Sequence, residues 1–277
     1  MNFKSFYPLI EDALKEDIPY DDITSDLIEE NLSSKAYIIC KEDCVLCGID
    51  LVFALFRYID KEIKLEKLLS DGERVSKGKI ICNISGNTRG LLKGERVALN
   101  LLSYLSGIAT QTASFVEIID KYNVKLLDTR KTLPLYRSLA KYAVKIGGGF
   151  NHRYSLSDMI LIKDNHIKAV GGISNVMEAL RNGKNHHPFA KVEIEVKNLK
   201  EAMTALMYSP DVIMLDNFTI SECEEALTYL RGKVEVEISG GINLSNIEKY
   251  AKLKPDYISV GSITHSVKAI DFSLEIE

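Results

Sequence analysis

The stretch LLDTRKTLPLYRSLAKYAVKIGGGFNHRYSLSDMILIKDNH, residues 126–166, decides the fold of this chain. It holds an apolar run at its start, a helical pattern over Leu135–Ile146 and a second apolar run, Met159–Ile162. Strand, helix and strand in this order are typical of a parallel sheet. The stretch also carries nine Lys, Arg and His residues against three Asp and no Glu. In a chain of net charge −4, such a cationic cluster indicates a pocket for a polyanion.

The same alternation continues toward the C-terminus. The apolar runs predicted to be strands are Val124–Asp128, Met159–Ile162, Val192–Val196, Val212–Leu215, Val234–Ile238 and Tyr257–Val260. The helical patterns are Leu135–Ile146, Ser174–Arg181, Leu199–Tyr208, Ile220–Leu230 and Leu244–Leu253. Six or seven such units favour a closed α/β barrel over an open sheet. Barrels of this kind place their functional sites at the carboxyl ends of the strands.

The N-terminal part has a different pattern. Residues 5–16 have helical spacing, residues 34–84 are mostly short β-rich runs around a helix at Leu51–Ile59, and residues 92–122 read as helix. Gly107 marks a break or a close contact in this last helix. We therefore predict an α+β domain over residues 1–107, which residues 266–277 could complete, and a barrel domain over residues 108–265.

Composition narrows the classes of function. The slightly acidic balance argues against nucleic acid as the main partner, which needs a broad basic surface. No apolar run approaches the length of a membrane span, and the acidic N-terminus does not resemble a secretory signal, so a cytoplasmic location is expected. Cys40, Cys44 and Cys47 have a spacing that some iron–sulfur enzymes use, but we interpret them as small apolar residues.

Polar or glycine residues follow all six predicted strands. They are Asp128–Lys131, Lys163–His166, Glu195, Asp216–Asn217, Ser239–Gly241 and Gly261. Polar groups at one strand end are routine, but solvation does not readily explain them at six. We therefore expect these residues to surround one cavity.

Four of the predicted site residues are cations, Arg130, Lys131, Arg153 and Lys163. Arginine pairs bidentately with carboxylate or phosphate, and lysine adds a point charge suited to pyrophosphate. His152 is either a core histidine or a site residue. Its position beside Arg153, after three glycines that allow close backbone approach, favours the site.

The helix predicted over Leu135–Ile146 carries Arg137, Lys141 and Lys145 on one face. We interpret Lys141 and Lys145 as a solvated basic face. Arg137, in the first turn, lies nearer the predicted site. Arg96, near the start of the long helix, is interpreted from the sequence alone as a surface arginine.

Two carboxylates, Glu195 and Asp216, end neighbouring strands and suit Mg²⁺ or sugar hydroxyls. Glu193 shares the face of Glu195 only if its strand is regular. The Ser239-Gly240-Gly241 run before a helix expected near Leu244 suits a phosphate. Gly261 and His265, after the last strand, lie where phosphate sites of such barrels occur.

Together these features describe a phosphorylated sugar diphosphate that meets an acidic acceptor. Displacement at an anomeric carbon has an oxocarbenium-like transition state, so the protein would orient the substrates and stabilise charge. The sequence shows no Ser–His–Asp or Cys–His arrangement that would indicate covalent catalysis.

Several motifs along nearly the whole chain resemble the quinolinate phosphoribosyltransferase family. They are EDALKEDIPYDDITS, GERVALNLLSYLSGIAT, DTRKTLP, KYAVKIGGGFNHR, MILIKDNH, VEIEV, MLDNF, ISGGI and SVGSITHS. The resemblance implies an N-terminal α+β sandwich domain and an incomplete α/β barrel of six or seven strands. It also implies transfer of phosphoribosyl from phosphoribosyl pyrophosphate to quinolinate with Mg²⁺, giving nicotinate mononucleotide, pyrophosphate and CO₂ in NAD synthesis.

The resemblance also implies a role for each site residue. Arg130, His152 and Arg153 would bind the quinolinate carboxylates, Lys131 and Lys163 would face the acceptor and pyrophosphate, and Glu195 and Asp216 would hold ribose and metal. Ser239, Gly240, Gly241, Gly261 and His265 would surround the 5′-phosphate. Arg96 would reach into the site of a neighbouring subunit, which implies a homodimer, with a hexamer as the larger alternative.

The chain departs from the family pattern at a few positions. TLPLYR stands where many relatives have TTPGLR, so Leu133 and Leu135 are expected to alter the start of the next helix. Ala140 replaces a frequent Glu, and Asp22 a frequent Gly. Two alternatives stay open: the molybdenum-transport-associated homologue of the family, with another acceptor, and a barrel that binds phosphorylated metabolites without catalysis.

Overall fold

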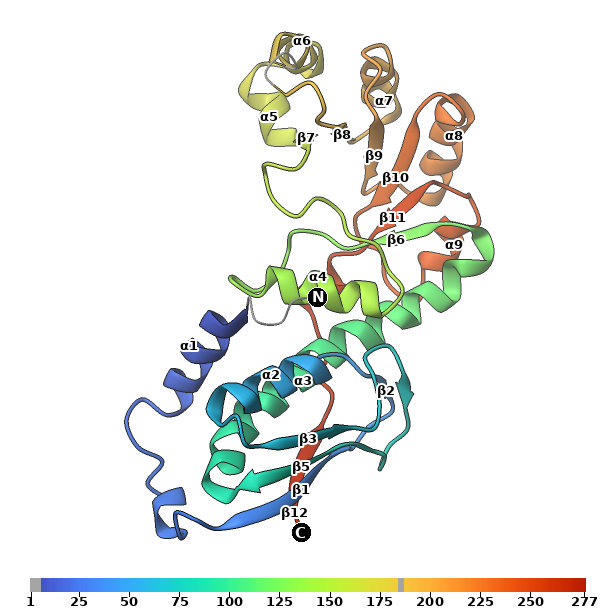
Figure 1. The fold of residues 1–277 in the computed structure, drawn as a ribbon. Helices are drawn as coiled ribbons and strands as arrows, with labels where there is room; N and C mark the ends of the chain where they lie inside the picture. The colour runs from blue at the N-terminus through green and yellow to red at the C-terminus, as the bar shows by residue number, and fades with distance from the viewer. Residues whose placement is uncertain (1–5, 184–186) are drawn as a thin grey trace. The chain divides into compact units, whose positions relative to one another are not determined.

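The computed structural model describes residues 6–183 and 187–277, which fall into two compact units (Figure 1). Unit 1 extends to Gln111 and also includes Val267–Glu277, and unit 2 is Thr112–Ser266. The expected domain boundary at residue 107 lies inside helix α3, Thr88–Ile119, which runs from one unit into the other. The change of unit therefore occurs within a continuous helix.

Unit 1 is built on a four-stranded antiparallel sheet of order β12-β1-β5-β3. Its strands are β1 Ser33–Cys40, β3 Lys64–Lys67, β5 Ile80–Asn87 and β12 Phe272–Ile276. A second, two-stranded sheet joins β2 Cys44–Val45 to β4 Arg74–Val75. The helices before α3 are α1 Tyr7–Asp17, the 3-10 turn η2 Ser25–Leu27 and α2 Ile49–Ile59. The C-terminal residues thus complete the N-terminal sheet through the pairing of β12 with β1.

Glycine permits close packing within unit 1. A Cβ on Gly107 would lie 2.4 Å from the backbone oxygen of Lys268, so this glycine marks a close contact and not a break in α3. Cys40, Cys44 and Cys47 are buried free thiols, and the Sγ atoms of Cys40 and Cys44 lie 3.4 Å apart. Their burial agrees with the interpretation of these residues as core.

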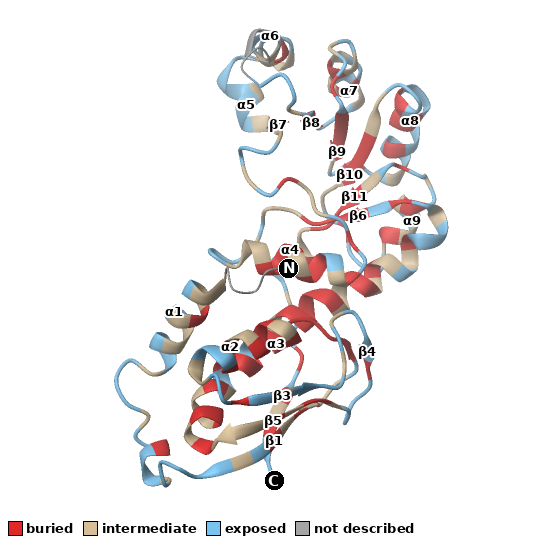
Figure 2. Ribbon diagram, in the orientation of Figure 1, coloured by how far each residue is buried: buried red, intermediate tan, exposed pale blue. Residues whose placement is uncertain are grey.

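Unit 2 is built on six parallel strands of order β6-β11-β10-β9-β8-β7. The strands are β6 Lys125–Leu127, β7 Ile160–Ile162, β8 Val192–Val196, β9 Val212–Asp216, β10 Glu235–Ser239 and β11 Tyr257–Ser259. The helices are η3 Asp120–Tyr122, α4 Arg137–Ile146, α5 Asp164–Ala169, α6 Ile173–Gly183, α7 Leu199–Leu206, α8 Ile220–Leu230, α9 Ile247–Ala251 and α10 Ser262–His265. Helix α7 packs against β8 and β9, and α8 against β10, so these strands are buried (Figure 2).

The sheet of unit 2 is an incomplete barrel. Residues at the carboxyl ends of all six strands line one cavity, which requires the sheet to curve. In residues 6–183 and 187–277, however, β6 and β7 do not pair, and β6 is instead flanked by an isolated parallel bridge between Leu127 and Phe150. The expectation of a closed barrel, based on strand spacing, was therefore wrong, and the incomplete barrel implied by the family resemblance is what the structure shows.

Several helices differ from the sequence-based expectation. Helix α4 begins at Arg137 and not at Leu135, because Leu135 has a φ of 65° and lies outside the helical region. Helix α9 begins at Ile247, three residues after the expected Leu244. The short helices α5 and α10 were not predicted at all. Among the described residues, none of the helices combines the length and the apolar character needed to span a membrane.

Candidate active site

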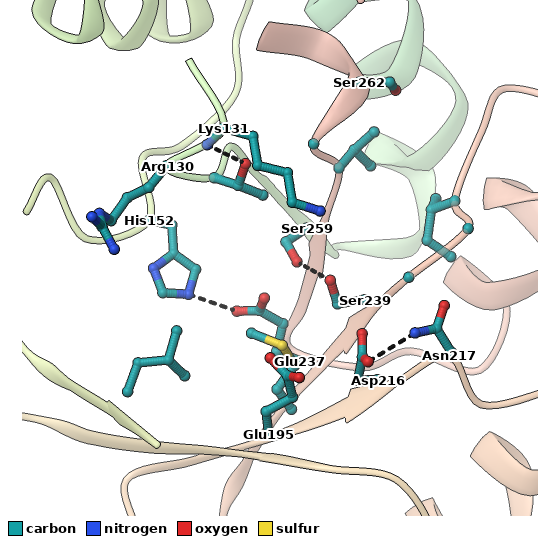
Figure 3. A pocket seen from close by; sticks show the side chains of 18 of the residues that line it. Arg130, Lys131, His152, Glu195, Asp216, Asn217, Glu237, Ser239, Ser259 and Ser262 are labelled. Atoms are coloured by element: carbon teal, nitrogen blue, oxygen red, sulfur yellow. Dashed lines mark hydrogen bonds and ion pairs between the residues drawn. The ribbon is translucent and has the colours of Figure 1, made fainter. Parts of the chain in front are cut away.

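A cavity of about 810 Å³ opens at the carboxyl ends of the strands of unit 2 (Figure 3). The predicted site residues that line it are Arg130, Lys131, His152, Arg153, Lys163, Glu195, Asp216, Ser239, Gly240, Gly241, Gly261 and His265. Asn217, Glu237, Ser259 and Ser262 also contribute. Unit 2 thus brings these residues together, whereas Asp128, Asp164, Asn165 and His166, which were also expected around the cavity, are not part of its lining.

Two guanidinium groups, those of Arg130 and Arg153, form one part of the wall. The Nε atoms of Arg130 and Arg153 are both buried and have no hydrogen-bond partner in the part of the chain that the structure describes. The Nη1 of Arg153 donates to the carbonyl oxygen of Met159 at 3.2 Å, which fixes the direction of its side chain. Burial, and then the positive charge of Arg130, lower the pKa of Arg153. An anion in the cavity would relieve the repulsion between the two guanidinium groups.

Both ring nitrogens of His152 are engaged within the protein. Its Nε2 lies 3.0 Å from Oε2 of Glu193 and 3.6 Å from Oε2 of Glu237. Its Nδ1 accepts the backbone N–H of Arg153 at 2.7 Å. An accepting Nδ1 places the ring proton on Nε2, which then donates to the carboxylates. A direct bond from His152 to an acceptor carboxylate stays a prediction, because the ring faces Glu237 (Figure 3).

Of the two glutamates below His152, Glu193 was considered in the sequence analysis but Glu195 was chosen in its place, and Glu237 was not identified. Glu193 and Glu237 are each 1% exposed, and their Oε1 atoms have no hydrogen-bond partner within the described residues. Burial and the proximity of Glu193 hold the pKa of Glu237 well above its ordinary value. Both alternate with apolar residues along their strands and so point to the inner face, as Glu195 does. That period of two was the signal that could have found them.

The carboxylates expected at the strand ends stand across the cavity from Arg130 (Figure 3). Oε2 of Glu195 accepts from Lys163 Nζ at 2.9 Å, which joins the cationic and anionic parts of the wall. Asp216 accepts from Asn217 Nδ2 at 2.8 Å. Burial, and then the charge of Glu195, raise the pKa of Asp216. These two residues end neighbouring strands, β8 and β9, as predicted.

A glycine-rich loop follows β10. Gly240 has a φ of 92°, and a Cβ there would lie 2.3 Å from Asn217 Oδ1, so only glycine fits. The loop continues through Asn243, while α9 begins later at Ile247, and its N-terminus is not part of the lining. The expected contribution of that helix to a phosphate site was therefore wrong, and the loop itself forms the wall. Gly261 gives similar access, because a Cβ there would meet the side chains of Lys131 and His265 at 3.2 Å.

Lys141 is buried, contrary to the expectation from the sequence. It was interpreted as solvated, but it is 4% exposed and its Nζ lies 2.6 Å from Oδ1 of the fully buried Asp128. Helical spacing could not reveal this partner, which comes from the end of β6. Lys145, on the same helix, is exposed as expected.

The remaining arginines lie outside the cavity lining. Arg137 donates from Nη1 to Tyr154 O at 3.3 Å and from Nε to Thr132 Oγ1 at 3.3 Å, so it links two loops near the site. Arg96 is exposed on α3 in unit 1. Its entry into a neighbouring site stays a prediction.

The cavity therefore offers cations for several anionic groups, carboxylates for hydroxyls or a metal ion, and a glycine loop that permits close backbone approach. Such a set can bind an anionic acceptor beside a phosphorylated sugar and stabilise charge as a bond between them forms. The described residues that line it include no cysteine, and two of its three serines are joined by the 2.9 Å bond from Ser259 Oγ to Ser239 Oγ.

Comparison with known proteins identifies the family of this chain. Residues 22–106 match the family described as quinolinate phosphoribosyl transferase, N-terminal domain, and residues 108–275 match its C-terminal domain. A probable nicotinate-nucleotide pyrophosphorylase [carboxylating] of Methanocaldococcus jannaschii is 46% identical over 97% of this chain and 96% of its own length. One from Bacillus subtilis is 36% identical, over 100% and 95%. The solved nicotinate-nucleotide pyrophosphorylase of Francisella tularensis has a TM-score of 0.94 and 41% identity, over 100% of this chain and 98% of that one. The chain belongs to the quinolinate phosphoribosyl transferase family.

Proposed function

We propose that this protein is a carboxylating nicotinate-nucleotide pyrophosphorylase of NAD synthesis. It transfers phosphoribosyl from phosphoribosyl pyrophosphate to quinolinate and releases pyrophosphate and CO₂, leaving nicotinate mononucleotide. The observation that carries this proposal is the convergence of Arg130, Lys131, Arg153 and Lys163 on the cavity that also holds Glu195 and Asp216. The names of relatives that are similar over nearly their whole length support the same reaction.

Quinolinate fits the side of the cavity formed by the two arginines. It carries two carboxylates on adjacent ring positions, and Arg130 and Arg153 offer two neighbouring guanidinium groups whose Nε donors lack partners among the described residues. Planar, bidentate recognition of carboxylate is what arginine provides best. We assign these two residues to the acceptor, with His152 holding the backbone N–H of Arg153 beside them.

The phosphoribosyl donor fits the opposite side. Backbone at Gly240 and Gly241 would approach its 5′-phosphate, with Gly261 and His265 closing the same end of the cavity. Glu195 and Asp216 would accept bonds from the ribose hydroxyls. Lys131 and Lys163 would neutralise the pyrophosphate as it leaves.

Glu195 and Asp216 also fit a Mg²⁺ ion. Burial, and then the negative charge of Glu195, raise the pKa of Asp216, and a divalent cation would relieve that repulsion. Magnesium is commonly held by one or two carboxylates together with substrate phosphates. When bound, the ion would supply positive charge to the leaving pyrophosphate.

The reaction has two parts with different demands. Displacement at the anomeric carbon builds positive charge on the sugar, which Glu195 and Asp216 are placed to stabilise. The new bond makes the ring nitrogen cationic, and that charge stabilises the carbanion that CO₂ leaves behind until a proton from water adds to that carbon. Phosphoribosyl transfer therefore precedes decarboxylation, and CO₂ release from quinolinate without phosphoribosyl pyrophosphate would contradict this order.

The deciding experiment is an assay with purified protein, quinolinate, phosphoribosyl pyrophosphate and Mg²⁺, read by chromatography of nicotinate mononucleotide. A parallel reaction with nicotinate, which lacks the second carboxylate, should release no pyrophosphate. Pyrophosphate release with some other acceptor would favour the molybdenum-transport-associated alternative. Phosphometabolite binding without turnover would favour a non-catalytic barrel.

A homodimer in the cytoplasm completes the proposal, with Arg96 of each subunit serving the site of its partner. The exposure of Arg96 on α3 leaves it available for such a role. Subunit complementation tests it. Arg96→Ala and Asp216→Asn proteins, each inactive alone, should regain activity when mixed and allowed to exchange subunits, because some mixed dimers then hold one intact site. Absence of recovery in confirmed mixed dimers would contradict the shared site, and light scattering would distinguish a dimer from a hexamer.

A further inference from the structure

A buried ion pair lies directly behind the arginine side of the cavity. It joins Lys141 of α4 to Asp128, the residue that follows β6, through a 2.6 Å contact. The Lys141 side chain is 5% exposed and that of Asp128 0%, and neither residue lines the cavity. The pair is therefore not explained by contact with substrate.

What the pair holds is the main chain of His152. Oδ1 of Asp128 accepts the backbone N–H of His152 at 2.7 Å, and Nζ of Lys141 donates to the backbone carbonyl of the same residue at 2.9 Å. Asn151 adds a third connection, since its Nδ2 donates both to Asp128 Oδ2 at 2.8 Å and to Lys141 O at 3.0 Å. Both sides of one peptide segment are thus tied to a single charged pair.

The bonds that Asp128 and Lys141 make to His152 also constrain Arg153, in two ways. The carbonyl that Lys141 holds belongs to the peptide that links His152 to Arg153. The backbone N–H of that peptide donates to the ring Nδ1 of His152, whose Nε2 is in turn held by Glu193. The direction in which the Arg153 side chain leaves the backbone is therefore set by Lys141 and Glu193, which do not line the cavity, together with the ring of His152, which does.

An ion pair in this place is costly to build. Burial raises the pKa of Asp128 and lowers that of Lys141, so in both cases burial works against the charged form and the partner works for it. Replacing a buried pair by apolar groups often leaves stability unchanged or improves it. Stability alone thus does not explain why both residues are charged. The main chain of His152 offers an N–H donor and a carbonyl acceptor, and holding both requires an acceptor such as Asp128 and a donor such as Lys141.

We propose that Asp128 and Lys141 are positioning residues for the acceptor, which fix the His152–Arg153 segment so that Arg153 meets a dicarboxylate. This inference rests on the proposed function, because it assigns Arg153 to quinolinate. No bond of the pair reaches the Ser239–Gly241 loop, Glu195 or Asp216 within the described residues, so the phosphoribosyl side of the cavity does not depend on it.

The test measures the KM of each substrate in Asp128→Asn, Lys141→Met and the double variant. Misplacing a binding group by about 1 Å can cost on the order of 10- to 100-fold, so the KM for quinolinate should rise by that factor. The KM for phosphoribosyl pyrophosphate should stay within about twofold, because its ligands are untouched. Lys145→Met, an exposed lysine of the same helix, is the matched control and should change neither constant.

The double variant leaves no unpaired buried charge and should fold when either single variant does not. It therefore decides the outcome if a single variant is insoluble. Equal increases in both KM values would show a general structural effect and overturn the proposal, as would unchanged KM values with a lower kcat. Wild-type protein in the same assay distinguishes failure of the proposed function from failure of the positioning role. Failure to form nicotinate mononucleotide there would refute the proposed function itself, whereas an active wild type with insensitive variants would refute the positioning role alone.

Discussion

Arg130 and Arg153 lie close together in the wall of one cavity, where burial, and then the charge of Arg130, lower the pKa of Arg153. Each keeps a buried Nε without a hydrogen-bond partner in the described residues. Like charges held together with unused donors are unfavourable by themselves, since a buried donor left unpaired costs about 1–3 kcal/mol. The arrangement becomes favourable when a doubly anionic group enters, which is why the acceptor is assigned to this wall.

Arg153→Met should therefore raise the KM for quinolinate by roughly 10- to 100-fold, since a charge-assisted hydrogen bond is worth about 1.5–3 kcal/mol. Arg153→Lys keeps the charge without the planar fork and should give an intermediate value. Steady-state kinetics with each substrate varied in turn would measure both. A matching rise in the KM for phosphoribosyl pyrophosphate would speak against the assignment.

Substitutions at Gly240 and Gly241 test the side of the cavity assigned to phosphoribosyl pyrophosphate, and the second serves as the control for the first. Both have positive φ, 92° and 64°, but a Cβ at Gly240 would clash with Asn217 at 2.3 Å, while one at Gly241 meets nothing within 4 Å. Gly240→Ala must displace Asn217, which donates to Asp216, and should raise the KM for phosphoribosyl pyrophosphate about 10-fold or more. Gly241→Ala carries the backbone strain without the clash and should have a clearly smaller effect. Equal effects of the two substitutions would show that strain, and not the contact with Asn217, is what matters.

Leu135 has a backbone that suits glycine. Its φ of 65° lies in the left-handed region, and its side chain is 89% exposed. That conformation costs a non-glycine residue roughly 1–2 kcal/mol, and a glycine adds somewhat less than 1 kcal/mol of chain entropy when unfolded. Leu135→Gly should thus raise the free energy of unfolding by about 0.5–1 kcal/mol in urea titrations. Leu133→Gly, at an exposed position without a positive φ, should lower it instead.

The bonds of Glu248 should account for part of the stability that unit 2 loses at low pH. Its carboxylate accepts from Lys121 Nζ and from Tyr122 Oη, each at 2.8 Å, and these bonds lower the pKa of Glu248 to about 2. A lowered folded-state pKa gives stability that is present above pH 4.5 and is lost as the pH falls toward 2. Glu248→Gln should therefore reduce the Tm at neutral pH and flatten its fall between these pH values in scanning calorimetry. An unchanged slope would show that the ion pair does not form in solution.

Elements with strong periodicity and clear caps were predictable. Strand β8 and helix α8 have the expected limits, Val192–Val196 and Ile220–Leu230. Helix α8 owes its sharp start to a capping box, in which Thr219 and Glu222 each accept the backbone N–H of the other. By contrast, α5 and α10 are too short to produce a hydrophobic period, so local pattern could not reveal them.

The site was predictable as far as strand ends could be read. Residues that support the cavity lining without ending a strand could not be predicted, because their roles depend on contacts between segments that are distant in the sequence. Lys141 has the spacing of a solvated lysine, and only the fold places it against Asp128. Glu237 was hidden by the same limitation, although its alternation with apolar neighbours indicated an inward direction.

The pairing of β12 with β1 has a consequence for the newly made chain. Strand β1 emerges early from the ribosome, but the strand that covers its edge follows the whole of unit 2. Until then β1 presents an uncovered strand edge, the kind of surface at which nascent chains associate wrongly. Unit 2 is continuous in sequence and can fold as soon as Ser266 has emerged, so unit 1, which starts to be made first, is the last to be complete.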